Sequence, residues 1–272
     1  MISLPAIKPN RPIGVFDSGI GGLTVLKELV DLLPGEEMIY LGDTARVPYG
    51  VRSSETIIRY SEENVLFLMN YGVKLIVVAC NTSSAIALPK LQRKFSFPIL
   101  GVVEAGARAA VEASRSGRIG VLGTEATIRS GAYSKYILSL NPRARVSAVP
   151  CPLFVPLAEE GWVADKVAKL AAEHYLRDLK SRTPDVVLLG CTHYPLLKGV
   201  IQKVMGKRVR LIDSAVETAR EVKELLDRTG LAREKDSGRL RYYVTDNPEK
   251  FRRVGERFFR RPIAKVSKIS LR

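Results

Sequence analysis

The chain reads IVVACNT at residues 76–82 and VLLGCTH at residues 187–193, and these two segments decide the predicted fold. Each is an aliphatic run that ends in a cysteine, Cys80 or Cys191, followed at once by hydrogen-bonding side chains. A short continuous apolar run is typical of a strand buried on both faces of a parallel sheet. The two segments therefore predict two buried strands, each with a thiol at its carboxyl end.

Similar apolar runs recur along the whole chain and alternate with amphipathic stretches. We expect strands at residues 13–16, 38–41, 75–79, 99–102, 119–122, 146–149, 186–189 and 209–212, and helices that include 53–71, 163–180 and 214–227. This alternation predicts an α/β protein with mostly parallel sheets covered by helices.

A weak internal repeat accompanies the alternation. The segment IGVF at residues 13–16 has a counterpart, IGVL, at residues 119–122. Each is followed, at nearly matched spacing, by one of the two strands that end in a cysteine. The repeat predicts two similar domains that face each other.

Composition restricts the class of protein. A chain of 272 residues with 46% hydrophobic and 26% charged residues is typical of a globular protein. We find no signal peptide and no apolar run near the roughly 20 residues that a membrane helix needs, so we expect a soluble, cytoplasmic protein. Three cysteines do not predict a disulfide framework, and with only two histidines no metal site is expected.

The formal net charge is +15, and basic residues are concentrated in residues 250–272. Such a segment can contact nucleic acid or another anionic surface. However, no aromatic-rich RNA motif, zinc finger or helix-turn-helix pattern accompanies the charge. We therefore expect a solvated helix and tail there, and nucleic-acid binding is not predicted.

Polar loops follow several predicted strands. They are DSGIGG at 17–22, GDT at 42–44, CNT at 80–82, GT at 123–124 and CTH at 191–193. Ligands of open parallel sheets bind outside the carboxyl ends of the strands, so these loops are expected to line a cleft. The first loop is neither a Rossmann fingerprint nor a P-loop. Its Asp17 is suited to bind an ammonium group or to orient a cysteine, although it can also simply cap the following helix.

Cys80 and Cys191 are the main candidates for chemistry. A helix amino terminus lowers the pKa of a thiol from its usual value near 8.5. Both cysteines are predicted at such a terminus, so we expect an accessible thiolate near neutral pH. Two opposed thiols suit the removal of a proton from one face of a carbon and its return to the other. The alternative is that each is a small buried apolar residue, as we expect for Cys151.

Other polar residues have two interpretations each. His193 is placed to assist Cys191 in proton transfer, or it is a structural hydrogen-bonding residue. Either Glu159 or Glu160 reaches the cleft, or both lie in a solvated turn. Tyr49 and the Gly50 amide are suited to hold a carboxylate, but PYG is also an ordinary turn sequence. His174 is expected on a helix surface.

Taken together, these motifs resemble the glutamate racemases, within the cofactor-independent aspartate/glutamate racemase superfamily. The matching segments are residues 14–25, 42–50, 79–82 and 190–195, with weaker matches at 154–157, at Glu159 and at 244–251. The resemblance runs from about residue 13 to residue 259, and its order and spacing are specific.

The resemblance implies interconversion of L-glutamate and D-glutamate without a cofactor or metal, supplying D-glutamate for bacterial peptidoglycan and so for cell shape. It implies two flavodoxin-like domains around a central cleft, residues 1–103 with 214–272 and residues 104–213. Homodimers are common in the family, and we expect one here.

The resemblance also assigns residues. Cys80 and Cys191 would be the two acid/base groups, Asp17 and His193 their polar assistants, and Glu159 would lie near the second cysteine. Contacts with glutamate would come from Asp17, Ser18, Tyr49, Gly50, Asn81, Thr82, Thr192 and His193.

Three other functions stay open from the sequence. One is an aspartate or hydantoin racemase, or a maleate isomerase, with the same cysteine pair. Another is a thiol hydrolase with Cys191 as nucleophile and His193 as base. The third is a non-enzymatic protein that binds its partner through the basic tail.

Overall fold

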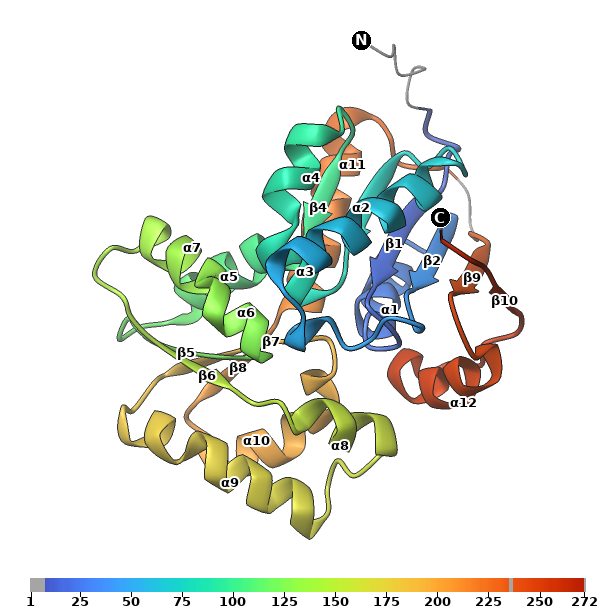
Figure 1. Cartoon of the computed structure of the whole chain (residues 1–272). Helices are drawn as coiled ribbons and strands as arrows, with labels where there is room; N and C mark the ends of the chain where they lie inside the picture. The colour runs from blue at the N-terminus through green and yellow to red at the C-terminus, as the bar shows by residue number, and fades with distance from the viewer. Residues whose placement is uncertain (1–7, 235–236, 272) are drawn as a thin grey trace.

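Two parallel sheets organise the chain (Figure 1). The structure, a computed structural model, describes residues 8–234 and 237–271. The first sheet has the order β10-β9-β2-β1-β3-β4 and consists of β1 (Ile13–Asp17), β2 (Met38–Gly42), β3 (Leu75–Val78), β4 (Ile99–Gly101), β9 (Leu240–Val244) and β10 (Val266–Lys268). The second has the order β6-β5-β7-β8 and consists of β5 (Arg118–Gly123), β6 (Arg145–Pro150), β7 (Val186–Gly190) and β8 (Arg210–Asp213).

Helices cover both sheets. They are α1 (Leu23–Leu32), α2 (Ser54–Met69), α3 (Asn81–Ile86), α4 (Leu88–Lys94), α5 (Val102–Ala113), α6 (Glu125–Ser130), α7 (Ala132–Leu140), α8 (Phe154–Glu160), α9 (Lys166–Ser181), α10 (Lys198–Met205), α11 (Ser214–Thr229) and α12 (Pro248–Phe259), with short 3-10 turns η1 (Tyr49–Val51) and η2 (Tyr194–Leu197). The α/β class predicted from the alternation is confirmed.

The two sheets repeat one strand order. In the first, β1 lies between β2 and β3, and β4 pairs with β3. In the second, β5 lies between β6 and β7, and β8 pairs with β7. Each cysteine segment is the third strand of its set and pairs with the strand that carries the IGV repeat. The sequence repeat therefore corresponds to a structural one.

Side-chain caps define the ends of the long helices. The Ser53 hydroxyl accepts from the Thr56 amide at the start of α2, and the Asp165 carboxylate accepts from the Ala168 amide at the start of α9. Such caps satisfy amides that have no partner within the helix. The helix α11 ends at Gly230, whose φ of +66° suits a residue without a Cβ.

One apolar core joins the two sheets. It runs from Leu26 of α1 through Val222 of α11 to Leu189 of β7 and Leu176 of α9, and all four side chains are buried. Further clusters of buried residues lie beneath α2 to α4 and beneath α5 and α7. The two sheets are thus joined by continuous packing.

The carboxyl-terminal segment differs from the expected solvated tail. Residues 240–244 and 266–268 form the strands β9 and β10, which extend the first sheet beside β2, as the blue and red ribbons of Figure 1 show. The helix α12 buries Phe251, Phe258 and Phe259. The sequence LRYYV of β9 carries a charged residue and two tyrosines, so it lacks the continuous apolar run that marked the other strands.

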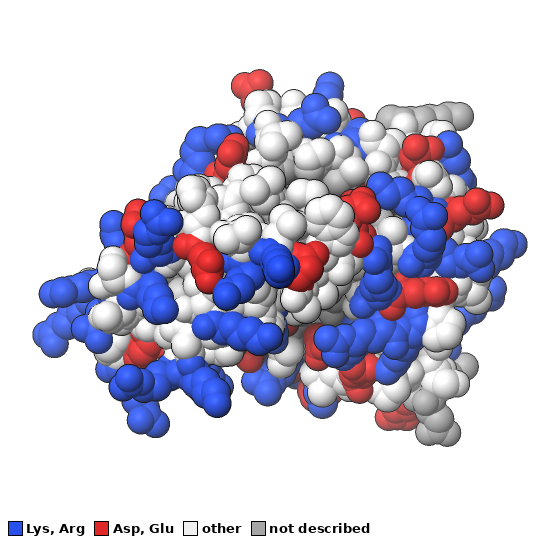
Figure 2. Space-filling view, turned by 90° about the horizontal axis from the view of Figure 1, so that it is seen from below, with Lys and Arg blue, Asp and Glu red and all other residues white. Residues whose placement is uncertain are grey.

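The positive charge is spread over the surface. Figure 2 shows Lys and Arg side chains across the whole lower face of the molecule, with Asp and Glu among them. Among the helices of residues 8–234 and 237–271, none combines the length and apolarity needed to cross a membrane.

Candidate active site between the two sheets

The loop at residues 17–22, which follows β1, adjoins both cysteine loops, because Ser18 Oγ lies 3.6 Å from Cys80 Sγ and Gly21 lies against Thr192 and His193. The Thr24 hydroxyl at the start of α1 donates to the Thr192 carbonyl at 3.0 Å. The Tyr133 hydroxyl of α7 donates to Asn81 Oδ1, beside Cys80, at 2.5 Å. A Cβ added to Gly21 would lie 2.3 Å from Thr192 Oγ1, so only glycine permits this close approach of the loop 17–22 to the loop that carries Cys191.

Cys80 lies at the amino cap of α3, and its side chain is 5% exposed. Its thiol donates to Ser18 Oγ at 3.6 Å. Burial, and next the charge of Asp17, raise the pKa of Cys80 to about 11, although hydrogen bonds with Ser83 and Ser18 lower it. The expected thiolate near neutral pH is therefore wrong for Cys80, because desolvation outweighs a helix of only six residues.

Asp17 lies at the end of β1 and is fully buried. Its Oδ2 accepts from the Gly19 amide at 2.9 Å, while no residue that the structure describes bonds Oδ1. Burial raises the pKa of Asp17, and the charge of His193 and backbone hydrogen bonds lower it. A buried carboxylate oxygen without a partner is costly, so it points to a cationic ligand group at this position.

Cys191 is 6% exposed and follows β7. The expected helix terminus is wrong here: the residues after His193 form the 3-10 turn η2, with Pro195 near its start, before α10 begins at Lys198. The neighbour of the thiol is instead an imidazole, because Cys191 Sγ lies 3.8 Å from His193 Nδ1.

His193 links Cys191 to Glu159, whose Oε1 lies 3.1 Å from His193 Nε2. Burial alone lowers the pKa of His193, but hydrogen bonds and charge from Cys191 and Glu159 raise it to about 10. The hydrogen bond with His193 lowers the pKa of Glu159 in turn. The ring is therefore an imidazolium at neutral pH, held between a sulfur and a carboxylate.

Three threonine hydroxyls form a cluster beside Asn81. Thr82 Oγ1 lies 3.0 Å from Thr124 Oγ1 and 3.1 Å from Thr127 Oγ1, and Thr124 and Thr127 are 3.0 Å apart. Asn81 Nδ2 is buried without a hydrogen-bond partner in residues 8–234 and 237–271. Each hydroxyl has one donor hydrogen, so the cluster can donate to an anion when a hydroxyl turns away from its neighbour, and the Asn81 amide can donate as well.

Sequence reasoning predicted Thr82 and Asn81 as site residues and placed Thr124 in a loop expected to line the cleft, but it missed Thr127. The signal for Thr124 was its position at a strand end, directly after β5. Thr127 lies one turn further along, in α6, and its amide bonds the Thr124 side chain that caps the helix.

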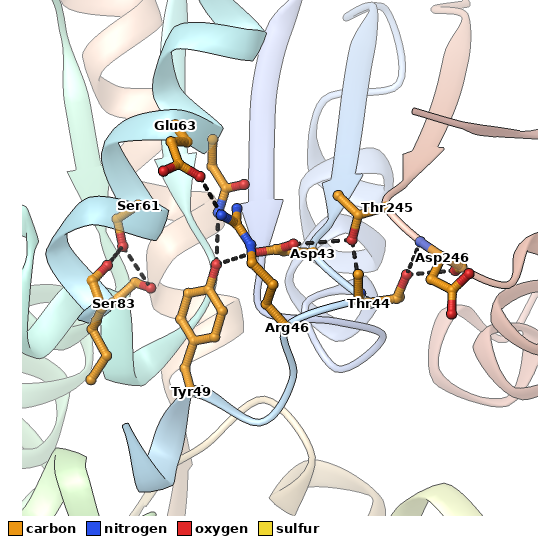
Figure 3. A network of polar contacts seen from close by, with 12 residues as sticks. Asp43, Thr44, Arg46, Tyr49, Ser61, Glu63, Ser83, Thr245 and Asp246 are labelled. Atoms are coloured by element: carbon orange, nitrogen blue, oxygen red, sulfur yellow. Dashed lines mark hydrogen bonds and ion pairs between the residues drawn. The ribbon is translucent and has the colours of Figure 1, made fainter. Parts of the chain in front are cut away.

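The loop after β2 carries Tyr49 and Gly50. The Tyr49 hydroxyl donates to Asp43 Oδ2 and accepts from Asn64 Nδ2 at 3.1 Å, and the side chain is 1% exposed (Figure 3). This hydroxyl is thus engaged within the protein. Gly50 reaches the other sheet, because an added Cβ would lie 2.7 Å from Thr124 Cβ.

The other candidates lie away from chemistry. His174 and Glu160 are exposed, and Cys151 is buried in the core. No group of three His, Cys, Asp or Glu suited to a metal occurs among the residues described. A cavity of about 230 Å³ adjoins the site, with Gly19, Thr44, Glu159 and Lys250 in its walls, but neither cysteine lines it. Both thiols are therefore buried beneath the residues that form the walls of this cavity.

Two parallel sheets with the same strand order, each with a buried cysteine just after its third strand, define an α/β protein built on a repeated unit. The Asp/Glu/Hydantoin racemase family model matches residues 13–222, and the chain belongs to this family. The family resemblance drawn from the motifs is thus confirmed, and the protein is an isomerase.

Similar proteins support the assignment. The chain is 54% identical to a glutamate racemase of Geobacter metallireducens over 97% of this chain and 98% of that protein. A solved glutamate racemase isoform of Bacillus anthracis is 37% identical, with a TM-score of 0.94, covering 97% and 98% of the two chains. A glutamate racemase of Francisella tularensis in complex with D-glutamate is 41% identical, with a TM-score of 0.92 and the same coverage.

Proposed function

We propose that this protein interconverts L-glutamate and D-glutamate, with Cys80 and Cys191 as the two acid/base groups. The observation that carries the proposal is the pair of buried thiols at equivalent strand ends, each with its own polar assistants. The relatives named above are glutamate racemases, which favours glutamate over aspartate or hydantoins.

The proposed mechanism uses the different surroundings of the two sulfurs. The His193 imidazolium stabilises Cys191 as a thiolate, which takes the α-proton from one enantiomer. Cys80, held as a thiol, gives its proton to the opposite face of the carbanion. The C–H electron pair passes through the carbanion into the new C–H bond. The enzyme is left with a Cys191 thiol and a Cys80 thiolate, the form that converts the other enantiomer.

Polar groups in the site have matching roles in the proposal. Asp17 Oδ1, which is buried and unbonded in the residues described, would accept from the substrate ammonium. The threonine cluster and Asn81 Nδ2 would donate to the α-carboxylate, while Ser18 and the Gly50 amide would hold the distal carboxylate.

The chemistry needs strong stabilisation, because the α-hydrogen of an amino acid is a far weaker acid than a thiol. Each pKa unit of mismatch costs about 1.36 kcal/mol. Donors fixed around the carboxylate in a site closed to water reduce that cost as charge develops. Holding each sulfur roughly 3–3.5 Å from Cα reduces it further.

We extend the proposal to the cell. D-glutamate from this reaction would enter peptidoglycan in the cytoplasm, with the enzyme acting as a homodimer and independently of pyridoxal phosphate. The two predicted domains, residues 1–103 with 214–272 and residues 104–213, remain part of the proposal. So do the roles given to Tyr49, Thr192 and Glu159 in the site.

One observation favours a second candidate, a thiol hydrolase. Cys191, His193 and Glu159 form a continuous chain of contacts like that of a nucleophile, its base and an orienting carboxylate. Such an enzyme would accumulate an acyl-cysteine intermediate and would not need Cys80. Mass spectrometry of the protein quenched during turnover, together with a Cys80→Ala variant, separates the two functions.

The deciding experiment is a coupled assay for D-glutamate formed from L-glutamate with no added cofactor. It is run with a panel of amino acids in deuterium oxide, so that exchange of the α-hydrogen is scored for each. We expect racemisation and exchange with glutamate above all others. Activity with aspartate but not with glutamate would overturn the substrate assignment.

A further inference from the structure

A buried carboxylate outside the proposed reacting groups gathers three distant segments. Asp43 follows β2, and its side chain is 0% exposed. Its Oδ2 accepts from the Tyr49 hydroxyl and from Arg46 Nε at 2.7 Å, and its Oδ1 accepts from Thr245 Oγ1 at 3.0 Å (Figure 3). We call Asp43, Arg46, Tyr49, Asn64 and Thr245 the Asp43 hub.

The hub fixes the loop 43–51 to the helix α2. Arg46 pairs with Glu63 of α2, and Asn64 Nδ2 donates to the Tyr49 hydroxyl at 3.1 Å. Arg46 also lies over the ring of Tyr60, 4.0 Å from its centre. Both ends of the loop are thus held by one face of α2.

The hub also fixes the loop to the segment after β9. Thr245 Oγ1 accepts from the Ala45 amide at 2.8 Å while donating to Asp43. Beside it, Thr44 Oγ1 accepts from the Asp246 amide at 2.8 Å. A residue some 200 positions away in sequence therefore sets the path of this loop.

The loop, in turn, closes over the proposed substrate. Gly50 lies against Thr124 of the threonine cluster, and Val47 packs within 3.3 Å of where a Gly19 Cβ would be. The loop thus touches the Asp17 loop on one sheet and the hydroxyl cluster on the other. Its position determines the distance between the two walls that would hold the carboxylates of glutamate.

We propose that Asp43 is a positioning residue, which holds the loop 43–51 in the position needed to bind glutamate between the two sheets. This inference rests on the proposed function. The carboxylate touches neither thiol, so it acts on substrate binding rather than on proton transfer. Because the carboxylate itself is buried and Arg46 and Thr245 are partly buried, loss of its charge leaves Arg46 and the Tyr49 hydroxyl poorly satisfied and loosens the whole loop.

The chain offers matched controls. Asp185, at the amino end of β7, is also a carboxylate that joins segments: it accepts from the Ser114 hydroxyl and from the Arg115 and Ser116 amides, each at 2.7 Å. It lies at the amino end of β7, whereas the cysteine loop follows the carboxyl end of the same strand. Asp185→Asn and Ser114→Ala therefore repeat the chemical changes of Asp43→Asn and Thr245→Val away from the site.

The experiment measures kcat and KM for both enantiomers in these four variants, with the melting temperature of each. Asp43→Asn should raise KM about tenfold, as expected for loss of a hydrogen bond to a charged group, and lower kcat less. Thr245→Val should raise KM about threefold. Both controls should lower the melting temperature while leaving KM within about twofold of the wild type.

Two further measurements make the result decisive. Arg46→Gln should also raise KM. Asp43→Asn with Arg46→Gln should raise KM less than the two single effects multiplied, because the contact between residues 43 and 46 then no longer sets a charge against a neutral partner. Amide hydrogen exchange should speed up in residues 43–51 of Thr245→Val, the mildest variant.

An unchanged KM in Asp43→Asn and Thr245→Val, with an active wild type, overturns the role of the hub. An inactive wild type overturns the proposed function instead.

Discussion

The Cys80 and Cys191 sides of the site occupy equivalent positions in the two sheets but have opposite surroundings. Cys80 is a buried thiol next to the carboxylate of Asp17, and its pKa is raised to about 11. Cys191 lies beside the His193 imidazolium, itself held by Glu159. The repeated strand order places the two sulfurs, whereas the loops and α8 supply their different neighbours.

This difference has a chemical consequence. Two identical thiols would be protonated together, and neither would then be ready to accept a proton. Burial and the carboxylate of Asp17 keep Cys80 a thiol, so the proposed mechanism gives the role of first proton acceptor to Cys191, beside the His193 imidazolium. The comparison thus predicts a site already prepared for one enantiomer, with the other protonation form produced by turnover.

The largest expected effect comes from removing either sulfur. Cys80→Ala and Cys191→Ala should each abolish racemisation, by at least the factor of about 10²–10⁴ that a general acid or base contributes. The coupled assay for D-glutamate measures the loss. Retention of activity in Cys80→Ala alone would favour the thiol hydrolase.

Serine variants sharpen the comparison. Because the two enantiomers have equal free energy, kcat/KM for racemisation must be the same in both directions, and asymmetry has to be read from hydrogen exchange. In deuterium oxide, Cys80→Ser and Cys191→Ser should exchange the α-hydrogen of opposite enantiomers preferentially. If both variants treat the enantiomers alike, one sulfur per face is wrong.

The next effect comes from the assistants. His193→Asn should reduce kcat by about 10²-fold, since it removes the cation that stabilises the Cys191 thiolate. Alkylation of Cys191 by iodoacetamide should slow at neutral pH in this variant, while that of Cys80 stays the same. Mass spectrometry of tryptic peptides reports each thiol separately, and equal slowing at both would contradict the pairing of His193 with Cys191.

The sequence predicted the fold because its buried strands are continuous apolar runs, and it predicted the two thiols because they follow such runs. It missed β9 because LRYYV is half polar, and its place in the sheet depends on β2, some 200 residues earlier. It missed Thr127 because only the packing of α6 against α3 brings that hydroxyl to Thr82.

The protonation state of Cys80 was also beyond the sequence. A helix amino terminus is visible as a pattern, and it predicted a thiolate. The opposing desolvation comes from complete burial, together with a carboxylate 63 positions earlier, and both exist only in the folded chain. The tie between His193 and Glu159 is likewise a product of α8 packing beside η2.

A smaller effect is expected on stability as the pH changes. The pKa of His193 rises from 6.5 to about 10 on folding, so its pairing stabilises the protein fully below pH 6.5, and that contribution is lost as the pH rises toward 10. The lowered pKa of Glu159 acts in the other direction: its contribution is present above pH 4.5 and is lost as the pH falls below its folded value. The free energy of unfolding, measured in urea, should therefore fall more between pH 6.5 and pH 9 for the wild type than for His193→Asn. Equal losses would mean that the imidazolium is absent.

The smallest effect on activity is expected from the third cysteine, which tests whether burial alone makes a thiol reactive. Cys151 is as buried as the other two, but it lies in the core, where its thiol contacts the Val149 carbonyl at 3.6 Å. Burial raises the pKa of Cys151, and within the described part of the chain its thiol makes no hydrogen bond to a carboxylate or an imidazole. Cys151→Ala should lower the free energy of unfolding by about 1–2 kcal/mol through lost packing, while kcat and KM stay within about twofold of the wild type. A loss of activity comparable to that of Cys80→Ala would show that enclosure, rather than the polar assistants, distinguishes the two reactive thiols.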